Sequence, residues 1–423
     1  MNAQSWWEDV VQELARFQGQ HLENLPGAVI AAETRVSGPL IAAVGGGWSP
    51  NTICNIGSMT KTFTATAVLL ALEEADALDV DLPVAEFPGM QVYTEDPVKR
   101  RIRVRHLLQH TTGMPVFLEY AEAPQLPCLD PEGPPPGLPG ADLVGPAVPW
   151  IGSPGYTNEP VLTDDQCRPA RLLTLDEVSD HVMRNYPLQH EPGTEYSYSS
   201  ANYVVAGRLV ERLTGTSPNV YLKEKLFGPL GMRDSFFIAQ PTGDPALDAR
   251  IDEGVTAEQR ARIAEVSLIT RDGRWPPEVA PGPDGTWDKL RRNWRFVYPD
   301  GGMYTTAADL LAFLRAVRDG GVYRQRQVLS TAVVKLLMTD HGFGHTMGFG
   351  YRRSTSPYGQ GPGTLDHLGN IMTYFWYDPR QDDPLLGVFL SQRLANAIVN
   401  NNMADGMLAI FRVFVPLVSR SAR

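Results

Sequence analysis

The sequence has few cysteines, few lysines and no long apolar run. Its three cysteines, Cys54, Cys128 and Cys167, are too few for a disulfide framework and favour a reducing compartment. Cys128 and Cys167 could still pair, and the sequence leaves this open. No Cys-x-x-Cys pair and no zinc-type spacing of cysteine and histidine occurs. We therefore expect neither a metal site nor another cofactor.

Positive charge is also scarce. The chain carries 37 lysines and arginines against 48 aspartates and glutamates, a net charge of −11. This balance argues against a nucleic-acid or anionic-membrane partner, since both favour basic patches. No apolar run approaches the ~20 residues of a membrane span, and the N-terminus lacks the basic and apolar regions of a signal peptide. The expectation is a cytoplasmic protein without nucleic-acid or membrane partners; the sequence does not indicate its oligomeric state.

Apolar periodicity and turn residues predict helices and strands in separate parts of the chain. Helices are expected over 3–20, 58–75, 103–110, 174–185, 200–214, 217–228, 257–266, 306–318, 330–338 and 395–414. Strands are expected over 27–35, 39–47, 347–354, 363–369, 372–378 and 385–391. The predicted fold class is α/β (α+β), with N- and C-terminal strands in one antiparallel sheet, flanking helices and an inserted, mostly helical subdomain. An active site would lie in the cleft between the two.

In this interpretation residues 1–423 form a single catalytic unit rather than several domains. The sheet region comprises 27–57 and 345–415, and the mostly helical region comprises 58–340. Residues 115–170 interrupt the latter with 13 of the 35 prolines. Because proline fixes φ and removes a backbone donor, we expect no regular structure there. This insertion is either a segment that covers a site or a disordered one.

The first candidate for chemistry is Ser58-Met59-Thr60-Lys61 at the start of a predicted helix. Residues three apart share a helix face, and a serine near the positive helix end suits a developing alkoxide. A lysine one turn on can accept its proton if burial lowers the lysine pKa. Only six lysines occur in the chain, so a lysine three residues after a serine at a helix start would less often arise by chance. The alternative is an ordinary helix start with an exposed lysine.

Two further candidates follow. Tyr198 precedes an amphipathic helix and could act as a general acid or base; the alternative is a packing tyrosine, with Ser200 as an N-cap. His367 and Gly369 lie on a predicted strand, where a glycine often marks a close backbone approach, here by a substrate. The alternative for His367 is a surface or core histidine satisfied by hydrogen bonds.

Together these motifs resemble those of the serine β-lactamase-like superfamily, in its class C branch. Ser-x-x-Lys, then Tyr-x-Ser and then His-x-Gly occur in that order. The resemblance extends to blocks at 104–115, 192–211, 226–237 and 301–314, and it covers most of 27–415 except the proline-rich insertion. Esterases, D-amino-acid amidases, carboxypeptidases and acyltransferases belong to the same branch.

The resemblance implies roles for particular residues. Ser58 would be the acylated nucleophile, Lys61 a proton acceptor beside it, and Tyr198 the group that shuttles the proton to the leaving group. Ser200 and His367 would face the substrate, and the backbone N–H groups of Ser58 and of Asn370, which follows Gly369, would form the oxyanion hole.

This sequence departs from the class C pattern at two positions. Ser200 stands where those lactamases usually have asparagine, and His367 replaces the lysine of Lys-Thr-Gly, as in esterase-like members. The resemblance therefore implies a hydrolase or acyltransferase for an ester or amide of a small intracellular molecule, its partners an acyl donor and an amine or alcohol acceptor. A β-lactamase or D-Ala-D-Ala-type peptidase is the first alternative. A catalytically silent binding protein on the same fold is the second, and the joint presence of Ser58, Lys61 and Tyr198 argues against it.

Two other signals carry less weight. His106 and His110 have the spacing of a zinc pair, but Leu107 occupies the position where the metalloprotease motif has glutamate. Tyr374 and Trp376 would either line an apolar acyl pocket or pack in the core.

Overall fold

The structure is a computed structural model. It describes residues 3–20, 25, 27–90, 96–114, 174–185, 187–238, 255–264, 297–369, 371–380, 383–393 and 409–421. The proline-rich insertion predicted over 115–170, with Cys128 and Cys167, lies outside these residues. Cys54 is buried and free.

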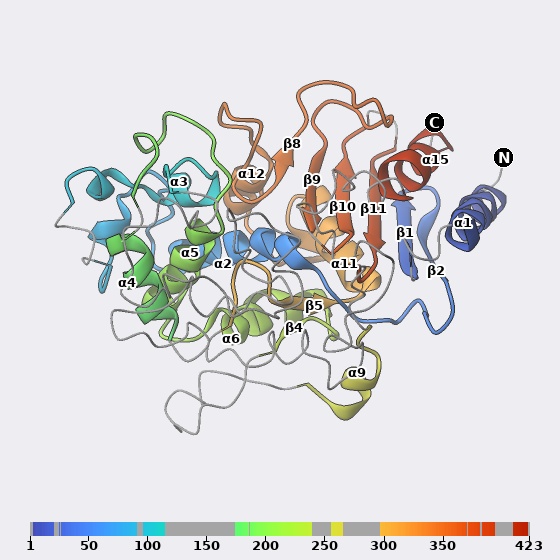
Figure 1. Cartoon of the computed structure of the whole chain (residues 1–423), viewed down its shortest axis with the longest axis horizontal. Coiled ribbons are helices and arrows are strands. Elements are labelled where there is room, and N and C mark those ends of the chain that lie inside the picture. The colour runs from blue at the N-terminus through green and yellow to red at the C-terminus, as the bar shows by residue number, and fades with distance from the viewer. Residues whose placement is uncertain are drawn as a thin grey trace, which may run out of the picture.

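Strands from the two ends of the chain form one six-stranded sheet, as predicted (Figure 1). Its order is β2-β1-β11-β10-β9-β8, and every neighbouring pair is antiparallel. In sequence order its members are β1 (Ala28–Thr34), β2 (Gly38–Val44), β8 (Gly350–Tyr351), β9 (Leu365–Gly369), β10 (Thr373–Asp378) and β11 (Leu385–Leu390). Val29 of β1 lies opposite Leu390 of β11, so residues from opposite ends of the sequence are neighbours at the centre of the sheet.

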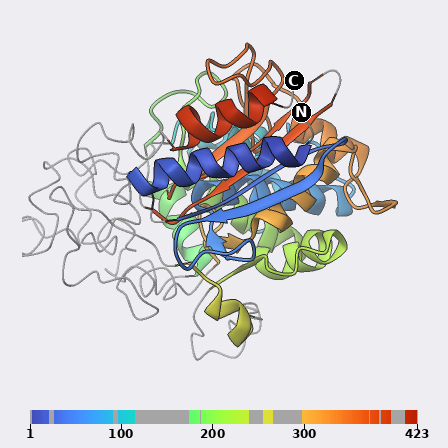
Figure 2. The same ribbon diagram turned by 90° about the vertical axis from the view of Figure 1, so that its right-hand side faces the viewer.

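Both faces of this sheet are covered by helices. Alternate residues of a strand point to opposite faces, and accordingly Ala28 and Ile30 belong to one apolar core whereas Val29 and Ala31 belong to the other. Helix α1 (Ala3–Gln20), the π-helix η8 (Ala409–Phe414) and α15 (Val415–Ser421) contribute to the first core, and α1 and α15 lie side by side in Figure 2. Helix α11 (Ala307–Arg318) packs on the second face.

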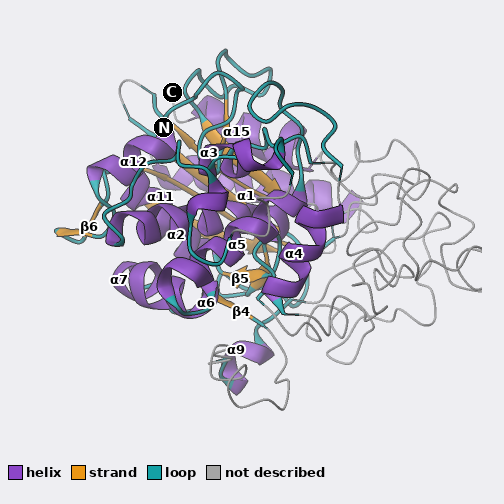
Figure 3. Cartoon of the chain, turned by 90° about the vertical axis from the view of Figure 1, so that its left-hand side faces the viewer, coloured by secondary structure: helices purple, strands orange, loops and turns teal. Residues whose placement is uncertain are grey.

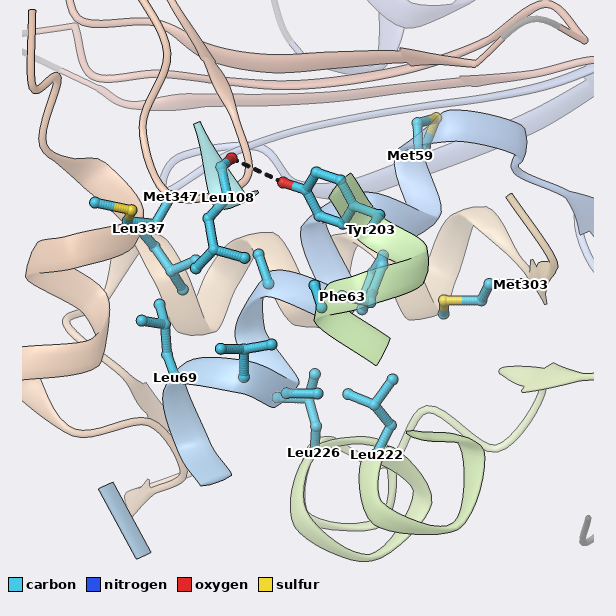
Figure 4. Packing of buried hydrophobic residues seen from close by; sticks show 14 of the residues in the cluster. Met59, Phe63, Leu69, Leu108, Tyr203, Leu222, Leu226, Met303, Leu337 and Met347 are labelled. Carbon is cyan, nitrogen blue, oxygen red and sulfur yellow. Dashed lines mark hydrogen bonds between the residues drawn. The ribbon is translucent and has the colours of Figure 1, made fainter. Parts of the chain in front are cut away.

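The helical region surrounds a central helix, α2 (Thr60–Glu74), whose first thirteen residues are all buried. Figure 3 shows the helices gathered around it, and Figure 4 shows its Phe63 and Leu69 packed near Tyr203, Leu222 and Leu226. Helices α5 (Ser200–Thr214), α6 (Pro218–Leu222) and α12 (Thr331–Met338) contact α2. Further described helices of this region are α3 (Val104–Leu108), α4 (Leu175–Asn185), α7 (Gly228–Leu230) and α9 (Ala257–Ala261), and a π-helical turn, Lys223–Phe227, joins α6 to α7.

Short strands at 236–237, 303–305, 322–323 and 326–327 lie within the region predicted to be mostly helical, and Cys54–Asn55 of the predicted sheet region pairs with one of them rather than with the six-stranded sheet. Strands β3 (Cys54–Asn55), β5 (Met303–Thr305) and β4 (Phe236–Phe237) form a three-stranded sheet, and β6 (Val322–Tyr323) pairs with β7 (Arg326–Gln327). Sequence periodicity does not predict them, because two or three residues are too short to show a period.

Some predicted helix ends are wrong. The helix expected over 257–266 ends at Ala261, because Ile263 bridges to Ile53. The last helix, expected to end at 414, continues to Ser421, although its predicted start lies outside the described residues. Among the helices that the structure describes, none combines the length and the apolar character that a bilayer span requires.

Candidate active site

Ser58 lies in a tight turn between β3 and α2. The 3₁₀ turn Gly57–Met59 precedes α2, so Ser58 stands just before the α-helix that was predicted to begin there. Gly57 has φ +53°, a conformation that glycine adopts without steric cost. Its N–H donates to the side-chain oxygen of Asn55 at 2.9 Å. This turn places the Ser58 side chain at the helix start, and Ser58 is partly exposed there.

Side chains from the C-terminal part of the chain form hydrogen bonds with the backbone just before this turn. The side-chain oxygen of Gln392 accepts the N–H of Asn55 at 3.1 Å, and its amide nitrogen donates to the Asn55 carbonyl at 2.7 Å. The hydroxyl of Thr373, the first residue of β10, donates to the carbonyl of Ile56 at 2.9 Å. Three buried side-chain contacts, one from β10 and two from Gln392 just after β11, therefore fix the backbone just before Ser58.

Gly369 permits this close approach. A Cβ on Gly369 would lie 2.0 Å from Thr373 Oγ1 and 2.4 Å from the Ile56 carbonyl oxygen. The predicted strand is present, and the groups that approach Gly369 closely are this backbone and Thr373; the approach of a substrate stays a prediction.

Replacing Gly369 by alanine should destabilise the protein by about 1–3 kcal/mol, because the backbone of Ile56 cannot move away without breaking its bond to Thr373. Chemical denaturation of Gly369→Ala against the unaltered protein measures this. Gly46→Ala is the control, since nothing lies within 4 Å of a Cβ there, and a change within about 0.5 kcal/mol is expected. Equal effects at both positions would contradict this account of Gly369.

Lys61, the second residue of α2, is fully buried, and its ammonium faces Ser58. Lys61 Nζ lies 3.1 Å from Ser58 Oγ. The alternative of an exposed lysine at an ordinary helix start is therefore wrong. Nζ also donates to the backbone carbonyl of Asp300 at 3.2 Å and forms an ion pair with the Asp300 carboxylate.

Tyr198 completes a group of three side chains around Ser58. Lys61 Nζ lies 4.8 Å from the centroid of the Tyr198 ring, and the phenol shares hydrogen bonds with Lys61 and Ser58. Burial raises the pKa of Tyr198, the charge of Lys61 opposes this and that of Asp300 adds to it, so that the pKa stays above its ordinary value. The structure thus brings the predicted Ser58, Lys61 and Tyr198 together.

Three histidines lie beside this group. The His110 ring stacks on Tyr198 with centroids 4.4 Å apart, His345 meets His110 edge-on at 5.3 Å, and His367 lies 6.5 Å from His345. Burial lowers the pKa of His345 to about 4 and that of His367 to about 3, and it lowers the pKa of His110 well below its usual range. All three imidazoles are therefore neutral near pH 7.

The backbone fixes the orientation of these imidazoles. His367 Nδ1 lies 3.1 Å from the Leu368 carbonyl and His345 Nδ1 lies 2.8 Å from the Thr346 carbonyl. A carbonyl only accepts, so both Nδ1 atoms carry the proton. His110 Nδ1 instead accepts the N–H of Ser199 at 3.0 Å. His367 thus lies on β9 as predicted, near the candidate site.

The helix predicted over 103–110 is shorter in the structure and does not include His110. Helix α3 ends at Leu108 rather than at 110, and His110 adopts the left-handed conformation, with φ +57°. His106 accepts the N–H of Arg103 at its Nδ1, while His110 turns toward Tyr198. Across the described segments no group of three or more histidine, cysteine, aspartate or glutamate side chains is arranged to hold a metal ion.

The remaining predicted site residues have different outcomes. Ser200 is the first residue of α5 and is buried, and Ser199 occupies the cap position without a side-chain cap bond, so Ser200 is not an N-cap. Asn370 lies outside the described residues. Tyr374 and Trp376 point to the face of the sheet that packs on α1 and η8, so they are core residues rather than an acyl pocket.

Sequence motifs do not reveal Asp300, His110 or His345. Asp300 stands in Pro-Asp-Gly, a typical turn sequence, immediately before the recognised block 301–314. His110 lies inside the recognised block 104–115, whose pattern predicts only a structural helix. Its position three residues before a glycine gives no sign of a role beside Tyr198.

Comparisons with known proteins identify the family of this chain. The model of the family named Beta-lactamase matches residues 14–405. The chain is 28% identical to "Penicillin-binding protein 4" of Amycolatopsis lactamdurans over 331 residues, covering 76% of this chain and 68% of that protein. It is 23% identical over 345 residues to "Putative D-alanyl-D-alanine carboxypeptidase" of Escherichia coli (strain K12), covering 78% of this chain and 66% of that protein, slightly under two thirds of its length.

A solved structure extends the likeness to the whole fold. The structure of "EstCE1, a hydrolase with promiscuous acyltransferase activity" superposes with a TM-score of 0.65 at 18% identity and covers 99% of both chains. The family model spans most of this chain, including Ser58, Lys61, Tyr198 and His367. The chain belongs to the β-lactamase family.

Proposed function

We propose that this protein is a serine hydrolase or acyltransferase that forms an acyl-enzyme on Ser58. The observation that carries the proposal is the contact of a fully buried lysine with a partly exposed serine, Lys61 Nζ being 3.1 Å from Ser58 Oγ. A buried amine that touches a hydroxyl and a phenol is arranged for proton transfer rather than for solubility. The proposed substrate is an ester or amide of a small molecule.

The reaction would proceed in two halves. Ser58 Oγ bonds to the carbonyl carbon of the donor while its proton passes to the Lys61–Tyr198 relay. The tetrahedral intermediate collapses, the carbon–oxygen or carbon–nitrogen bond of the donor breaks, and the relay returns the proton to the departing alcohol or amine. The oxygen of water, or the oxygen or nitrogen of an alcohol or amine acceptor, then bonds to the acyl carbon. The bond from that carbon to Ser58 Oγ breaks, and the relay passes the proton of the acceptor to Ser58 Oγ.

The backbone N–H of Ser58 is one proposed donor to the oxyanion, at the start of α2 where the helix dipole favours negative charge. Asn370 is proposed as the second. His367 and Ser200 are proposed to contact the substrate, because His367 lies beside Lys61 and Ser200 begins the helix that follows Tyr198.

A D-Ala-D-Ala peptidase is a second candidate, favoured by the name of the Escherichia coli (strain K12) relative, "Putative D-alanyl-D-alanine carboxypeptidase". Both functions share the acyl-enzyme and differ in the donor. The likeness to EstCE1, which extends over 99% of both chains, favours a hydrolase that also transfers acyl groups.

Intact-mass measurement after reaction with a fluorophosphonate tests the proposal. We expect one adduct per chain, absent in Ser58→Ala. Ser356→Ala is the matched control, since Ser356 is a buried serine on the β8–β9 loop, and it should be labelled like the unaltered protein. Absence of a Ser58-dependent adduct would overturn the proposed function.

A substrate panel then separates the candidates. Short-chain aryl esters, a chromogenic cephalosporin and a D-Ala-D-Ala peptide are compared, each with and without added amine or alcohol. Preference for aryl esters is expected, with transfer products when an acceptor is present. Turnover confined to the peptide would instead support the peptidase.

A further inference from the structure

Asp300 supplies two of the oxygen atoms that surround the buried ammonium of Lys61. Nζ donates to the Asp300 backbone carbonyl at 3.2 Å and pairs with the carboxylate of the same residue, while Ser58 Oγ lies 3.1 Å away on a third side. The Tyr198 phenol also shares a hydrogen bond with this ammonium, so the three N–H donors of an ammonium all have acceptors nearby. Lys61 is fully buried and Asp300 is only 7% exposed, so bulk water does not replace either partner.

The loop that carries Asp300 is fastened to α2 on both sides of Lys61. The hydroxyl of Thr64 donates to the Pro299 carbonyl at 2.7 Å, and the N–H of Met303 donates to the hydroxyl of Thr60 at 3.2 Å. The chain on either side of Asp300 is thus held next to Lys61. These two bonds hold the backbone near Asp300, and the ion pair with Lys61 holds its buried carboxylate.

The groups that face Lys61 come from several other elements. They are Asp300 on the loop before β5, Tyr198 before α5, Tyr203 on α5, His110 after α3, His345 before β8 and His367 on β9. The three imidazoles are neutral above about pH 6.5 because the pKa of each lies below its ordinary value. Of these facing groups, only the Asp300 carboxylate opposes the charge of Lys61 near neutral pH.

The charge of Asp300 is the largest of the effects that raise the pKa of Lys61. Burial by itself lowers the pKa of Lys61, but the charge of Asp300 and then that of Tyr198 outweigh burial, so the pKa lies above its ordinary value. The charge of Asp300 also raises the pKa of Tyr198. Both members of the proposed relay therefore hold their protons more tightly because of one carboxylate.

We infer that Asp300 is a positioning residue for the reaction of Ser58, which through its ion pair holds Lys61 as an ammonium and fixes that ammonium against the nucleophile. This inference rests on the proposed function. At rest Lys61 donates a hydrogen bond to Ser58 rather than offering a free amine. The relay accepts the Ser58 proton only after the Lys61–Tyr198 pair has lost one proton to solvent.

The rate of Ser58 phosphonylation as a function of pH tests this inference. In that reaction Ser58 Oγ bonds to phosphorus, the phosphorus–fluorine bond breaks, fluoride leaves, and the serine proton passes through the relay to solvent. The rate of the unaltered protein should keep rising above about pH 9, since the groups that must lose a proton have raised pKa values. A plateau reached below about pH 8 would overturn the inference, and this needs no variant.

Asp300→Asn removes the charge and keeps the shape. Burial lowers the pKa of Lys61, and the Asp300 carboxylate raises it. Without the carboxylate the pKa of Lys61 should fall, so the relay loses its proton at lower pH. We expect the midpoint of the pH–rate curve to fall by at least about one pH unit. We also expect the plateau to fall by about tenfold or more, because the ammonium is less well fixed. A lower plateau with an unchanged midpoint would mean a merely structural role and would overturn the inference.

Two further variants separate charge from folding. Asp300→Glu keeps the charge, so its midpoint should stay with that of the unaltered protein even if the plateau falls. Glu33→Gln breaks another buried ion pair, that of Glu33 with Arg315 and Arg318, and should change stability without moving the midpoint. Circular dichroism shows which variants are folded. Failure of the unaltered protein to form any Ser58 adduct would count against the proposed function instead.

Discussion

Replacing Lys61 by methionine should lower kcat/KM for an aryl ester by at least about 10³-fold. Methionine keeps the unbranched shape but can neither accept a proton nor donate to Ser58 Oγ, from which Lys61 Nζ is 3.1 Å away. General acid–base groups typically contribute about 10²–10⁴-fold, and removal of one member of a relay often costs nearly as much as removal of all. Steady-state kinetics on Lys61→Met, with Ser58→Ala as the reference, measure the loss.

The same substitution should also destabilise the protein, for a separate reason. It leaves the Asp300 carboxylate buried without its counter-ion, and breaking a buried ion pair from one side costs about 3–5 kcal/mol. The double variant Lys61→Met with Asp300→Asn should recover most of this stability without recovering activity. Chemical denaturation of the single and double variants checks both statements. Turnover of Lys61→Met within tenfold of normal would remove Lys61 from the relay.

Replacing Tyr198 by phenylalanine should reduce kcat/KM by about 10²–10⁴-fold while the fold is preserved. Only the phenol oxygen, which shares hydrogen bonds with Lys61 and Ser58, is lost. The ring stays stacked on His110, with the centroids 4.4 Å apart, so the packing is retained. Kinetics and thermal unfolding of the same sample separate the two effects.

Tyr221→Phe is the matched control for that experiment. Tyr221 is also a largely buried tyrosine whose hydroxyl makes a side-chain hydrogen bond, to Glu74 at 3.0 Å, but it lies on α6 away from Ser58. It should lose about 1 kcal/mol of stability with turnover nearly unchanged. A similar loss of turnover in both variants would show that Tyr198 acts only through packing.

The sheet could be predicted from the sequence because its strands carry their own signals. The hairpin of β1 and β2 and the strands β9 to β11 are long enough to show alternation and turn residues, and placing the two ends of the chain in one sheet is confirmed. The proximity of Ser58 and Lys61 could also be predicted from the sequence, because a spacing of three residues places two side chains on the same face of a helix.

Contacts between distant parts of the chain could not be predicted in the same way. Asp300 meets Lys61 across 239 residues of sequence, and His110 meets Tyr198 only because the chain turns into a left-handed conformation after α3. Neither event leaves a periodic pattern. Gly369 shows the same limit, since the sequence indicated a close approach but not that the approaching group is the backbone of Ile56.

The pairing of β1 with β11 has a consequence for how the protein becomes active during synthesis. Val29 and Leu390 are adjacent in the sheet but 361 residues apart in the chain. At about 5–20 residues per second, the ribosome needs roughly 20 to 70 s to make the intervening chain, and until then one edge of the β1–β2 hairpin has no partner strand. Thr373 and Gln392, which hold the turn before Ser58, arrive equally late. Reactivity at Ser58 should therefore be among the last properties that the nascent chain acquires.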